Sequence, residues 1–118
     1  MKYDKIKGLD KNISKLIMGN DNQTNYDEAS KLWDHWIEVG GNSFDNAHIY
    51  GGGSMESMLG KWHRSRNNLA DLIIIAKGAH TPNCNPRSLS LQLTESIDRL
   101  ECESVDIYIM HRDNIEIP

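Results

Sequence analysis

The segment "DLIIIAK", residues 71–77, determines the class of fold. Residues 72–76 are all apolar and rich in isoleucine, a pattern typical of a strand buried on both faces of a parallel sheet. The run is far shorter than the roughly 20 residues that span a bilayer, so it does not predict a membrane helix. We therefore expect an α/β protein whose parallel sheet contains this strand.

Helix and strand patterns alternate on both sides of this segment. Short apolar runs that end in glycine or polar residues predict strands, and apolar side chains three or four positions apart predict helices. In chain order, the predicted elements are a strand at 15–18, a helix within 24–41, a strand at 42–47, a helix at 54–65, the strand at 71–77, a helix at 85–100 and a strand at 104–111. This β-α-β-α-β-α-β order predicts parallel (β/α) units with right-handed crossovers.

Local signals mark the ends of two of the helices. Ser54 is the expected N-cap of the second helix. In the third helix, Asn85 is the expected N-cap and Pro86 suits the first helical position. His63 falls on the polar face of the second helix, where we expect it to be solvated.

The length of the chain predicts a single domain and leaves two architectures open. A chain of 118 residues is within the usual size of one domain, here residues 1–118 with a polar leader at 1–13. The predicted elements suit either an open doubly wound sheet or part of a (β/α)8 barrel. A complete barrel needs roughly 250 residues, so only about half of one would be present.

Composition excludes several classes of partner. The formal net charge of −4, without a dominant basic cluster, argues against binding to nucleic acid or to an anionic membrane. The N-terminus has no apolar signal core, so we expect a cytoplasmic protein.

Cys84 and Cys102 are too few for a disulfide framework. A zinc site from His80 and Cys84 fits no standard spacing, so no metal is predicted.

Four polar side chains are predicted to meet at one edge of the sheet. Asp45, Lys77 and His111 each end a predicted strand, and Tyr50 lies in the loop after the second strand. Alone, each has an ordinary explanation, such as a helix cap or a solvated lysine. The carboxyl ends of parallel strands, however, form the edge where such folds place their active sites. The convergence of all four therefore favours a functional site.

These four residue types suit acid–base chemistry on a carbonyl group. A phenol is a poor proton donor at neutral pH, and a neighbouring ammonium group favours its ionised form. Lys77 would supply that charge, and Asp45 would hold Lys77 protonated and in place. His111 would donate a hydrogen bond to a carbonyl oxygen beside Tyr50. A carbonyl activated in this way accepts a hydride from a reduced nicotinamide.

Three segments resemble the N-terminal part of the aldo-keto reductases. They are "GGNSFDNAHIYGGGSMESMLGKW", "IIIAKG" and "SLQLTESIDRLECESVDIYIMHRDN", and the resemblance extends from about residue 15 to the end of the chain. It implies the N-terminal half of a (β/α)8 TIM barrel that binds NADP(H), with NAD(H) not excluded. The implied activity is reduction of an aldehyde or ketone.

The resemblance also implies roles for individual residues. Asp45, Tyr50, Lys77 and His111 match the family's catalytic tetrad, with Tyr50 as the proton donor and with Tyr50 and His111 at the substrate. Gly19, Asn20 and Asp45 match positions near the cofactor. Two positions depart from the family pattern, since Asn20 and Asn46 both stand where the family has threonine.

Other interpretations of the glycine run fit less well. The spacing around Gly60 does not match a phosphate-binding loop. The run Gly51–Gly53 does not match a dinucleotide fingerprint either, because the last glycine of the G-x-G-x-x-G pattern is missing. Two functional hypotheses remain. The first is carbonyl reduction, and the second is a truncated, catalytically silent half-barrel that acts as a binding or assembly module. The exposed strand edges of a half-barrel would pair with another copy or with a missing C-terminal half.

Overall fold

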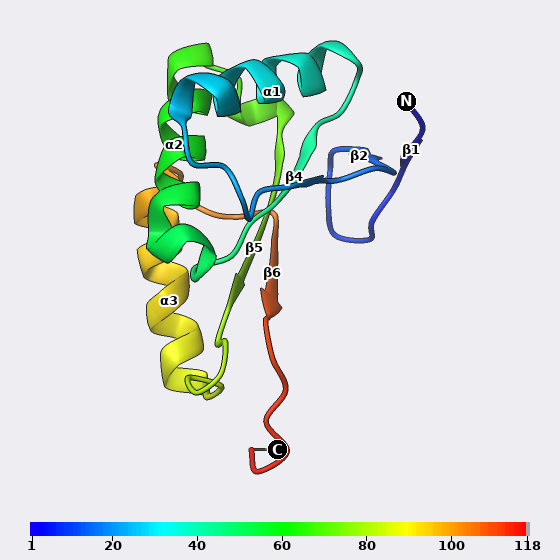
Figure 1. Cartoon of the computed structure of the whole chain (residues 1–118). Coiled ribbons are helices and arrows are strands. Elements are labelled where there is room, and N and C mark those ends of the chain that lie inside the picture. The colour runs from blue at the N-terminus through cyan, green and yellow to red at the C-terminus, as the bar shows by residue number, and fades with distance from the viewer. Residues whose placement is uncertain (118) are drawn as a thin grey trace.

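The computed structural model describes residues 1–117 and places in them a four-stranded parallel sheet (Figure 1). The strands, in sheet order, are β3 (Met18–Gly19), β4 (Ser43–Asp45), β5 (Ile73–Gly78) and β6 (Ile107–Met110). They are joined in turn by helices α1 (Tyr26–Glu38), α2 (Ser54–Arg66) and α3 (Pro86–Arg99). The predicted α/β class and the order of the parallel units are confirmed.

The three helices lie on one side of the sheet (Figure 1). Alternate residues of β5 point to opposite faces, so Ile74 joins the core under the helices while Ile73 and Ile75 join a smaller cluster on the other face. On the helix side, the rings of Trp33 and Trp62 meet edge to face with centroids 5.6 Å apart. Within residues 1–117, no helix is both long and apolar enough to cross a membrane.

The N-terminal residues form a two-stranded antiparallel hairpin on the face away from the helices. Its strands are β1 (Tyr3–Asp4) and β2 (Ile13–Ser14). Ile13 packs against Ile73 and Ile75, so the hairpin covers the part of that face near the amino ends of the strands. The strand expected at 15–18 is instead β3, because 15–17 are exposed and only Met18–Gly19 pair with β4.

The caps of two helices differ in how well the sequence predicts them. At α3, the Asn85 side chain accepts a hydrogen bond from the backbone N–H of Ser88, and Pro86 is the first helical residue, as predicted. At α2, the prediction of Ser54 as N-cap is wrong. Ser54 is already helical, and the cap position is taken by Gly53 in a left-handed conformation with φ of 106°.

The prediction that His63 is solvated is also wrong. Its side chain is buried, and its ring nitrogen Nε2 lies 2.6 Å from the carbonyl oxygen of Leu100. The reason is that α2 packs against α3 through the face that carries Gly60 and His63, which looks polar in the sequence. The imidazole therefore serves as a hydrogen-bonded contact between two helices.

Candidate active site

Asp45 and Lys77 form an ion pair across neighbouring strands. Asp45 is the last residue of β4, and Lys77 lies near the end of β5, with Asp45 in register with Ile75. The ammonium group of Lys77 contacts Asp45 Oδ1, and only 12% of the Lys77 side chain is exposed. The pair thus places a positive charge, held by a carboxylate, at the carboxyl edge of the sheet.

Tyr50 is brought over this pair by a tight turn. Tyr50 begins a short 3₁₀ turn that runs to Gly53, and Gly51 and Gly52 adopt φ values of 60° and 64°. Such left-handed conformations are costly for residues other than glycine, which explains the glycine run. The turn places the Tyr50 ring with its centroid 5.1 Å from Lys77 Nζ.

His111 completes the group directly after β6. Its backbone N–H donates to the carbonyl of Gly78, and its ring meets the Tyr50 ring at 90° with centroids 5.8 Å apart. Its ring nitrogen Nδ1 is buried and has no hydrogen-bond partner within residues 1–117. A buried nitrogen of this kind is a candidate to bond a ligand.

The surroundings of His111 favour its neutral form. Burial lowers the pKa of His111 from its ordinary value of 6.5. The positive charges of Lys77, His80 and Arg112 lower this pKa further, and the carboxylate of Asp45 acts in the opposite direction. At neutral pH the imidazole is therefore uncharged, with one nitrogen that donates and one that accepts.

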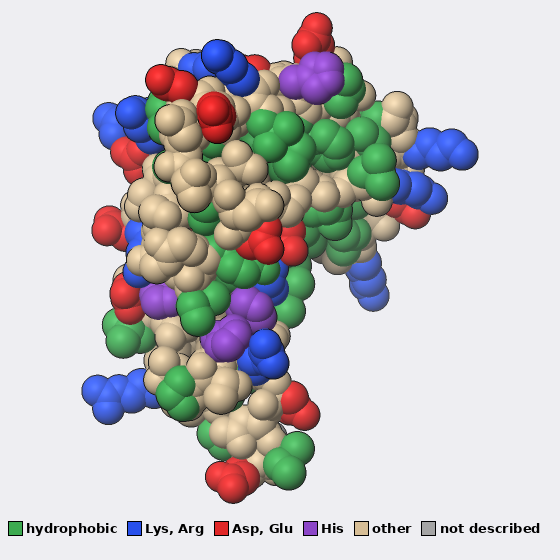
Figure 2. All heavy atoms as spheres, viewed as in Figure 1, with side chains coloured by type: hydrophobic (Ala, Val, Ile, Leu, Met, Phe, Trp, Pro, Cys, Tyr) green, Lys and Arg blue, Asp and Glu red, His purple; other side chains and the backbone are tan. Residues whose placement is uncertain are grey.

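A cavity of about 220 Å³ opens beside these residues. Its walls include Lys77, His80 and His111, and Ile49 and Gly52 contribute from both sides of Tyr50. Figure 2 shows histidine side chains gathered on one face of the molecule. The surface of the cavity is mostly apolar and carries a few polar side chains at the carboxyl edge of the strands, which is the combination typical of small-molecule sites.

His80 is a member of this group that the sequence did not reveal. Its ring meets that of His111 at 89° with centroids 4.8 Å apart. The sequence presents it only beside Cys84, at a spacing that fits no standard zinc site, and the Cys84 thiol instead donates to the carbonyl of Ala79. Its position two residues after β5, at the edge that carries Lys77, was the available signal.

Asn20 is buried beneath the site, and its side chain is already bonded. Its amide nitrogen donates to Asn46 Oδ1 at 3.0 Å, and its oxygen accepts from Trp33 Nε1 at 2.9 Å. The two residues that depart from the family pattern thus pair with each other and brace the end of β4. Gly19 is exposed and has open space beside its Cα. The expected cofactor contact of Gly19 and Asn20 stays a prediction.

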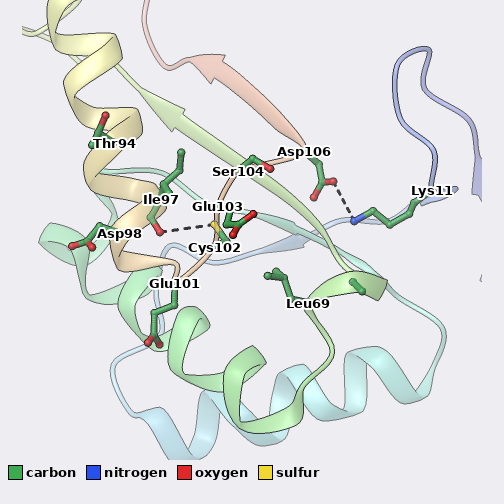
Figure 3. A pocket seen from close by; sticks show the side chains of 11 residues that line it. Lys11, Leu69, Thr94, Ile97, Asp98, Glu101, Cys102, Glu103, Ser104 and Asp106 are labelled. Carbon is green, nitrogen blue, oxygen red and sulfur yellow. Dashed lines mark hydrogen bonds and ion pairs between the residues drawn. The ribbon is translucent and has the colours of Figure 1, made fainter.

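A larger open groove, of about 1020 Å³, lies at the other end of the sheet (Figure 3). It is bordered by Lys11, Cys102 and Asp106, and Lys11 forms an ion pair with Asp106 just before β6 begins. Parallel α/β folds place their chemistry at the carboxyl ends of the strands, whereas this groove lies at the amino ends. Burial raises the pKa of the Cys102 thiol, which makes it a poor nucleophile.

No group of three or more histidine, cysteine, aspartate or glutamate side chains within residues 1–117 is arranged to hold a metal ion. The side chains at the carboxyl edge form an ion pair and a set of rings that meet edge to face, which suits hydrogen bonding and proton transfer.

Comparison with known proteins identifies relatives over the whole chain. A family model described as "Aldo/keto reductase family" matches residues 15–118. The uncharacterized oxidoreductase YrpG of Bacillus subtilis is 27% identical, in an alignment that covers 100% of this chain and 42% of YrpG. The chain therefore spans less than half the length of this relative.

Solved structures of the same family share the fold. The thermostable aldo-keto reductase Tm1743, solved with the inhibitor epalrestat, superposes with a TM-score of 0.81 at 28% identity. The superposition covers 100% of this chain and 45% of the Tm1743 chain. The holo form of aldo-keto reductase AKR11C1 from Bacillus halodurans superposes with a TM-score of 0.82 at 25% identity. The superposition covers 98% of this chain and 42% of the AKR11C1 chain. The four-stranded sheet is thus consistent with part of a (β/α)8 barrel.

Proposed function

Because the chain belongs to the aldo/keto reductase family, we propose that it carries the catalytic half of an NAD(P)H-dependent carbonyl reductase. The observation that carries this proposal is the convergence of Asp45, Tyr50, Lys77 and His111 at one edge of the sheet. The substrate would be a small aldehyde or ketone. The relatives are more than twice as long, so the remaining walls of the site would come from residues outside this chain.

The residues around the cavity fit a role in holding a carbonyl compound beside a nicotinamide. The unpartnered ring nitrogen of His111 and the open space beside Gly19 are two features that a bound ligand would satisfy or fill. Gly19 and Asp45 would lie at the cofactor. When bound, the reduced nicotinamide supplies a hydride to the carbonyl carbon.

Within this chain, the proposed chemistry is a proton transfer to the carbonyl oxygen. The Tyr50 hydroxyl gives its proton to that oxygen, and an uncharged His111 donates a hydrogen bond that holds the oxygen in position. The ammonium of Lys77 stabilises the negative charge left on the Tyr50 oxygen, and Asp45 keeps Lys77 in place. Each of these groups lies within one residue of a strand end or in the turn after β4.

A chimeric barrel tests this proposal. Residues 1–117 are joined to the C-terminal half of the thermostable reductase Tm1743. Tm1743 is a suitable donor because its structure superposes on 100% of this chain. With 4-nitrobenzaldehyde as substrate, we expect the chimera to oxidise NADPH and the chain alone to oxidise little or none. The loss of NADPH absorbance measures this oxidation. A chimera that unfolds cooperatively and binds NADPH, yet shows no turnover, contradicts the proposal.

The second candidate function is assembly through the uncovered strands. β3 and β6 are the edges of the sheet, and β6 leaves Ile109 and Met110 exposed by 44% and 49%. Leu16 and Ile17, just before β3, are also exposed, and Figure 2 shows apolar side chains at the surface. Exposed apolar edge strands favour pairing with another chain. This observation supports a module that associates with a second copy or with a separate C-terminal half.

Sedimentation velocity distinguishes the second candidate from the first. If the edges drive association, the chain forms dimers or larger species at micromolar concentration, and Met110→Lys on β6 disrupts them. Leu91→Lys is the matched control, because Leu91 is also exposed but belongs to helix α3 and not to an edge strand. A folded chain that stays monomeric at about 100 μM contradicts the assembly candidate.

A further inference from the structure

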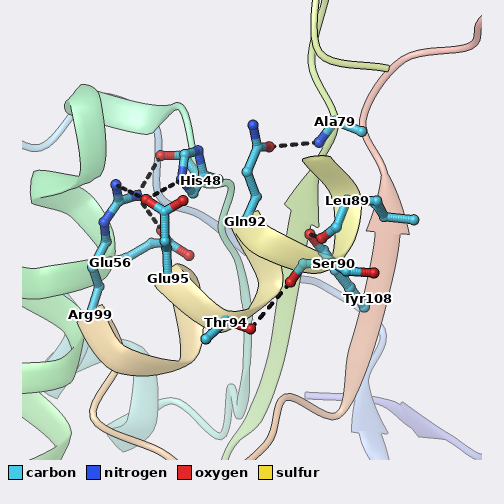
Figure 4. Close-up of polar contacts among 10 residues, drawn as sticks. All are labelled: His48, Glu56, Ala79, Leu89, Ser90, Gln92, Thr94, Glu95, Arg99 and Tyr108. Atoms are coloured by element: carbon cyan, nitrogen blue, oxygen red, sulfur yellow. Dashed lines mark hydrogen bonds and ion pairs between the residues drawn. The ribbon is translucent and has the colours of Figure 1, made fainter. Parts of the chain in front are cut away.

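A single arginine from α3 reaches across to the turn that carries Tyr50. Arg99 is the last residue of α3, and its Nη1 donates to the carbonyl oxygen of His48 at 2.9 Å and to Glu56 Oε1 at 3.1 Å (Figure 4). His48 precedes Tyr50 by two positions, and Glu56 lies in the first turn of α2. The guanidinium thus bonds to the chain on both sides of Tyr50.

Close packing adds a third contact to these two hydrogen bonds. A Cβ atom placed on Gly53 would lie 2.6 Å from Arg99 Cζ, so the guanidinium rests directly against the backbone of the turn. Gly53 has a φ of 106°, and Gly51 and Gly52 are also in left-handed conformations. A run of glycines is intrinsically flexible, so a fixed conformation here depends on contacts from outside the turn.

The charges around Arg99 form a network that is largely buried. Glu56 is fully buried, and only 24% of the Arg99 side chain is exposed. Glu95, one turn earlier on α3, lies 3.7 Å from Arg99 Nη2 and 3.4 Å from His48 Nε2. Removing Arg99 would leave the buried carboxylate of Glu56 without its cation, and a buried charge needs such a partner.

We propose that Arg99 is a positioning residue that sets the placement of Tyr50 over Lys77. The catalytic importance of this placement rests on the proposed function, but the placement itself is a property of the folded chain. The Arg99 guanidinium acts through the His48 carbonyl, Gly53 and Glu56. The turn is thereby held at both ends by one rigid, planar group.

Arg99→Lys separates positioning from general stabilisation. Lysine keeps the charge beside Glu56 but cannot reach the His48 carbonyl, Glu56 and Glu95 together, because it lacks the planar fork. Arg64→Met is the matched control, since Arg64 is an exposed arginine on α2 that pairs with Glu101, away from the turn. Both variants are made in the 118-residue chain.

The readouts are amide hydrogen exchange and the NMR signals of the Tyr50 ring. The N–H groups of Tyr50 and Gly52 donate within the turn, to Ala47 and Ile49. We expect Arg99→Lys to speed their exchange by about tenfold or more relative to amides of β5, and to shift the Tyr50 ring signals. Arg64→Met should change neither.

The proposal is overturned if the amides of Tyr50 and Gly52 change their exchange rates only in parallel with the amides of β5 in every variant, and if the Tyr50 ring signals do not shift. If Arg99→Lys fails to fold, Glu95→Gln perturbs the same network more mildly, because it removes the negative charge that lies beside Arg99 Nη2 and His48 Nε2 at a half-exposed position. If both variants fail to fold, Arg99 acts on the stability of the whole chain and not on the placement of Tyr50, and the proposal is also overturned. None of these readouts requires turnover, so a failure of the proposed reductase activity would leave the result on Arg99 intact.

Discussion

Gly60→Ala should destabilise the chain although alanine is the better helix former. A Cβ atom on Gly60 would lie 2.5 Å from the Arg99 carbonyl oxygen and 2.9 Å from the Leu100 carbonyl carbon. Both are backbone atoms, so α2 and α3 would have to move apart. Overpacking of this kind costs about 1–3 kcal/mol, and alanine in a helix interior offsets about 1 kcal/mol. Because both contacts are with backbone atoms, which cannot swing aside as a side chain can, the cost lies near the upper end of that range, and the net loss in the free energy of unfolding is about 1–2 kcal/mol.

Urea unfolding followed by tryptophan fluorescence measures this loss, because Trp33 and Trp62 are fully buried. Gly19→Ala is the control: no heavy atom would lie within 4 Å of a Cβ atom at this position, so the free energy of unfolding should change by less than about 0.5 kcal/mol. A Gly60→Ala chain as stable as the parent, or more stable, would refute the close packing of α2 on α3 that supports the Arg99 network.

Two further predictions concern the candidate site. Lys77→Met should abolish turnover in the chimeric barrel yet lower the free energy of unfolding by only about 1 kcal/mol, because the Asp45 carboxylate is 39% exposed and stays hydrated. Equal turnover in the variant and the parent would remove Lys77 from the mechanism. His111 should titrate below its ordinary pKa of 6.5 in an NMR experiment on the imidazole signals. Because the pKa is lower in the folded than in the unfolded chain, stability is highest above about pH 6.5 and falls as the pH drops toward the folded-state pKa. A His111 midpoint at or above 6.5 would contradict the burial of its ring beside Lys77.

The parts of the fold that the sequence predicts are those encoded by local patterns. The apolar run of β5 and the periodicity of α1 and α3 depend on neighbouring residues, and so do the Asn85 cap and Pro86. The positions of Asp45, Lys77 and His111 follow from them, because each residue lies at or next to the end of a strand. Their convergence is then a consequence of parallel pairing.

The features that sequence analysis missed depend on contacts between distant positions. The hairpin of residues 3–14 is held by packing of Ile13 on β5, and His63 is buried only because α3 covers it. Arg99 and His48 are 51 positions apart, and neither carries a local sign of the hydrogen bond between them. Such contacts arise from tertiary packing, which propensity and periodicity do not encode.

The Asn20–Asn46 pair shows the same limit at the site itself. Each residue, taken alone, is a polar substitution at a position near the expected cofactor. In the structure they bond to each other, and Trp33 bonds to the side-chain oxygen of Asn20. Only the parallel pairing of β3 with β4, with Gly19 opposite Asp45, brings the two asparagines together.

The central claim is that Tyr50 donates the proton in carbonyl reduction, and its most direct test is the kcat of Tyr50→Phe in the chimeric barrel with NADPH and 4-nitrobenzaldehyde. Tyr26→Phe serves as the control, because Tyr26 lies on α1 beside Lys61 and away from the site. We predict that Tyr50→Phe lowers kcat by about 10²–10⁴-fold with NADPH binding retained, and that Tyr26→Phe leaves kcat unchanged. A folded Tyr50→Phe barrel that binds NADPH and turns over as fast as the parent would contradict the account.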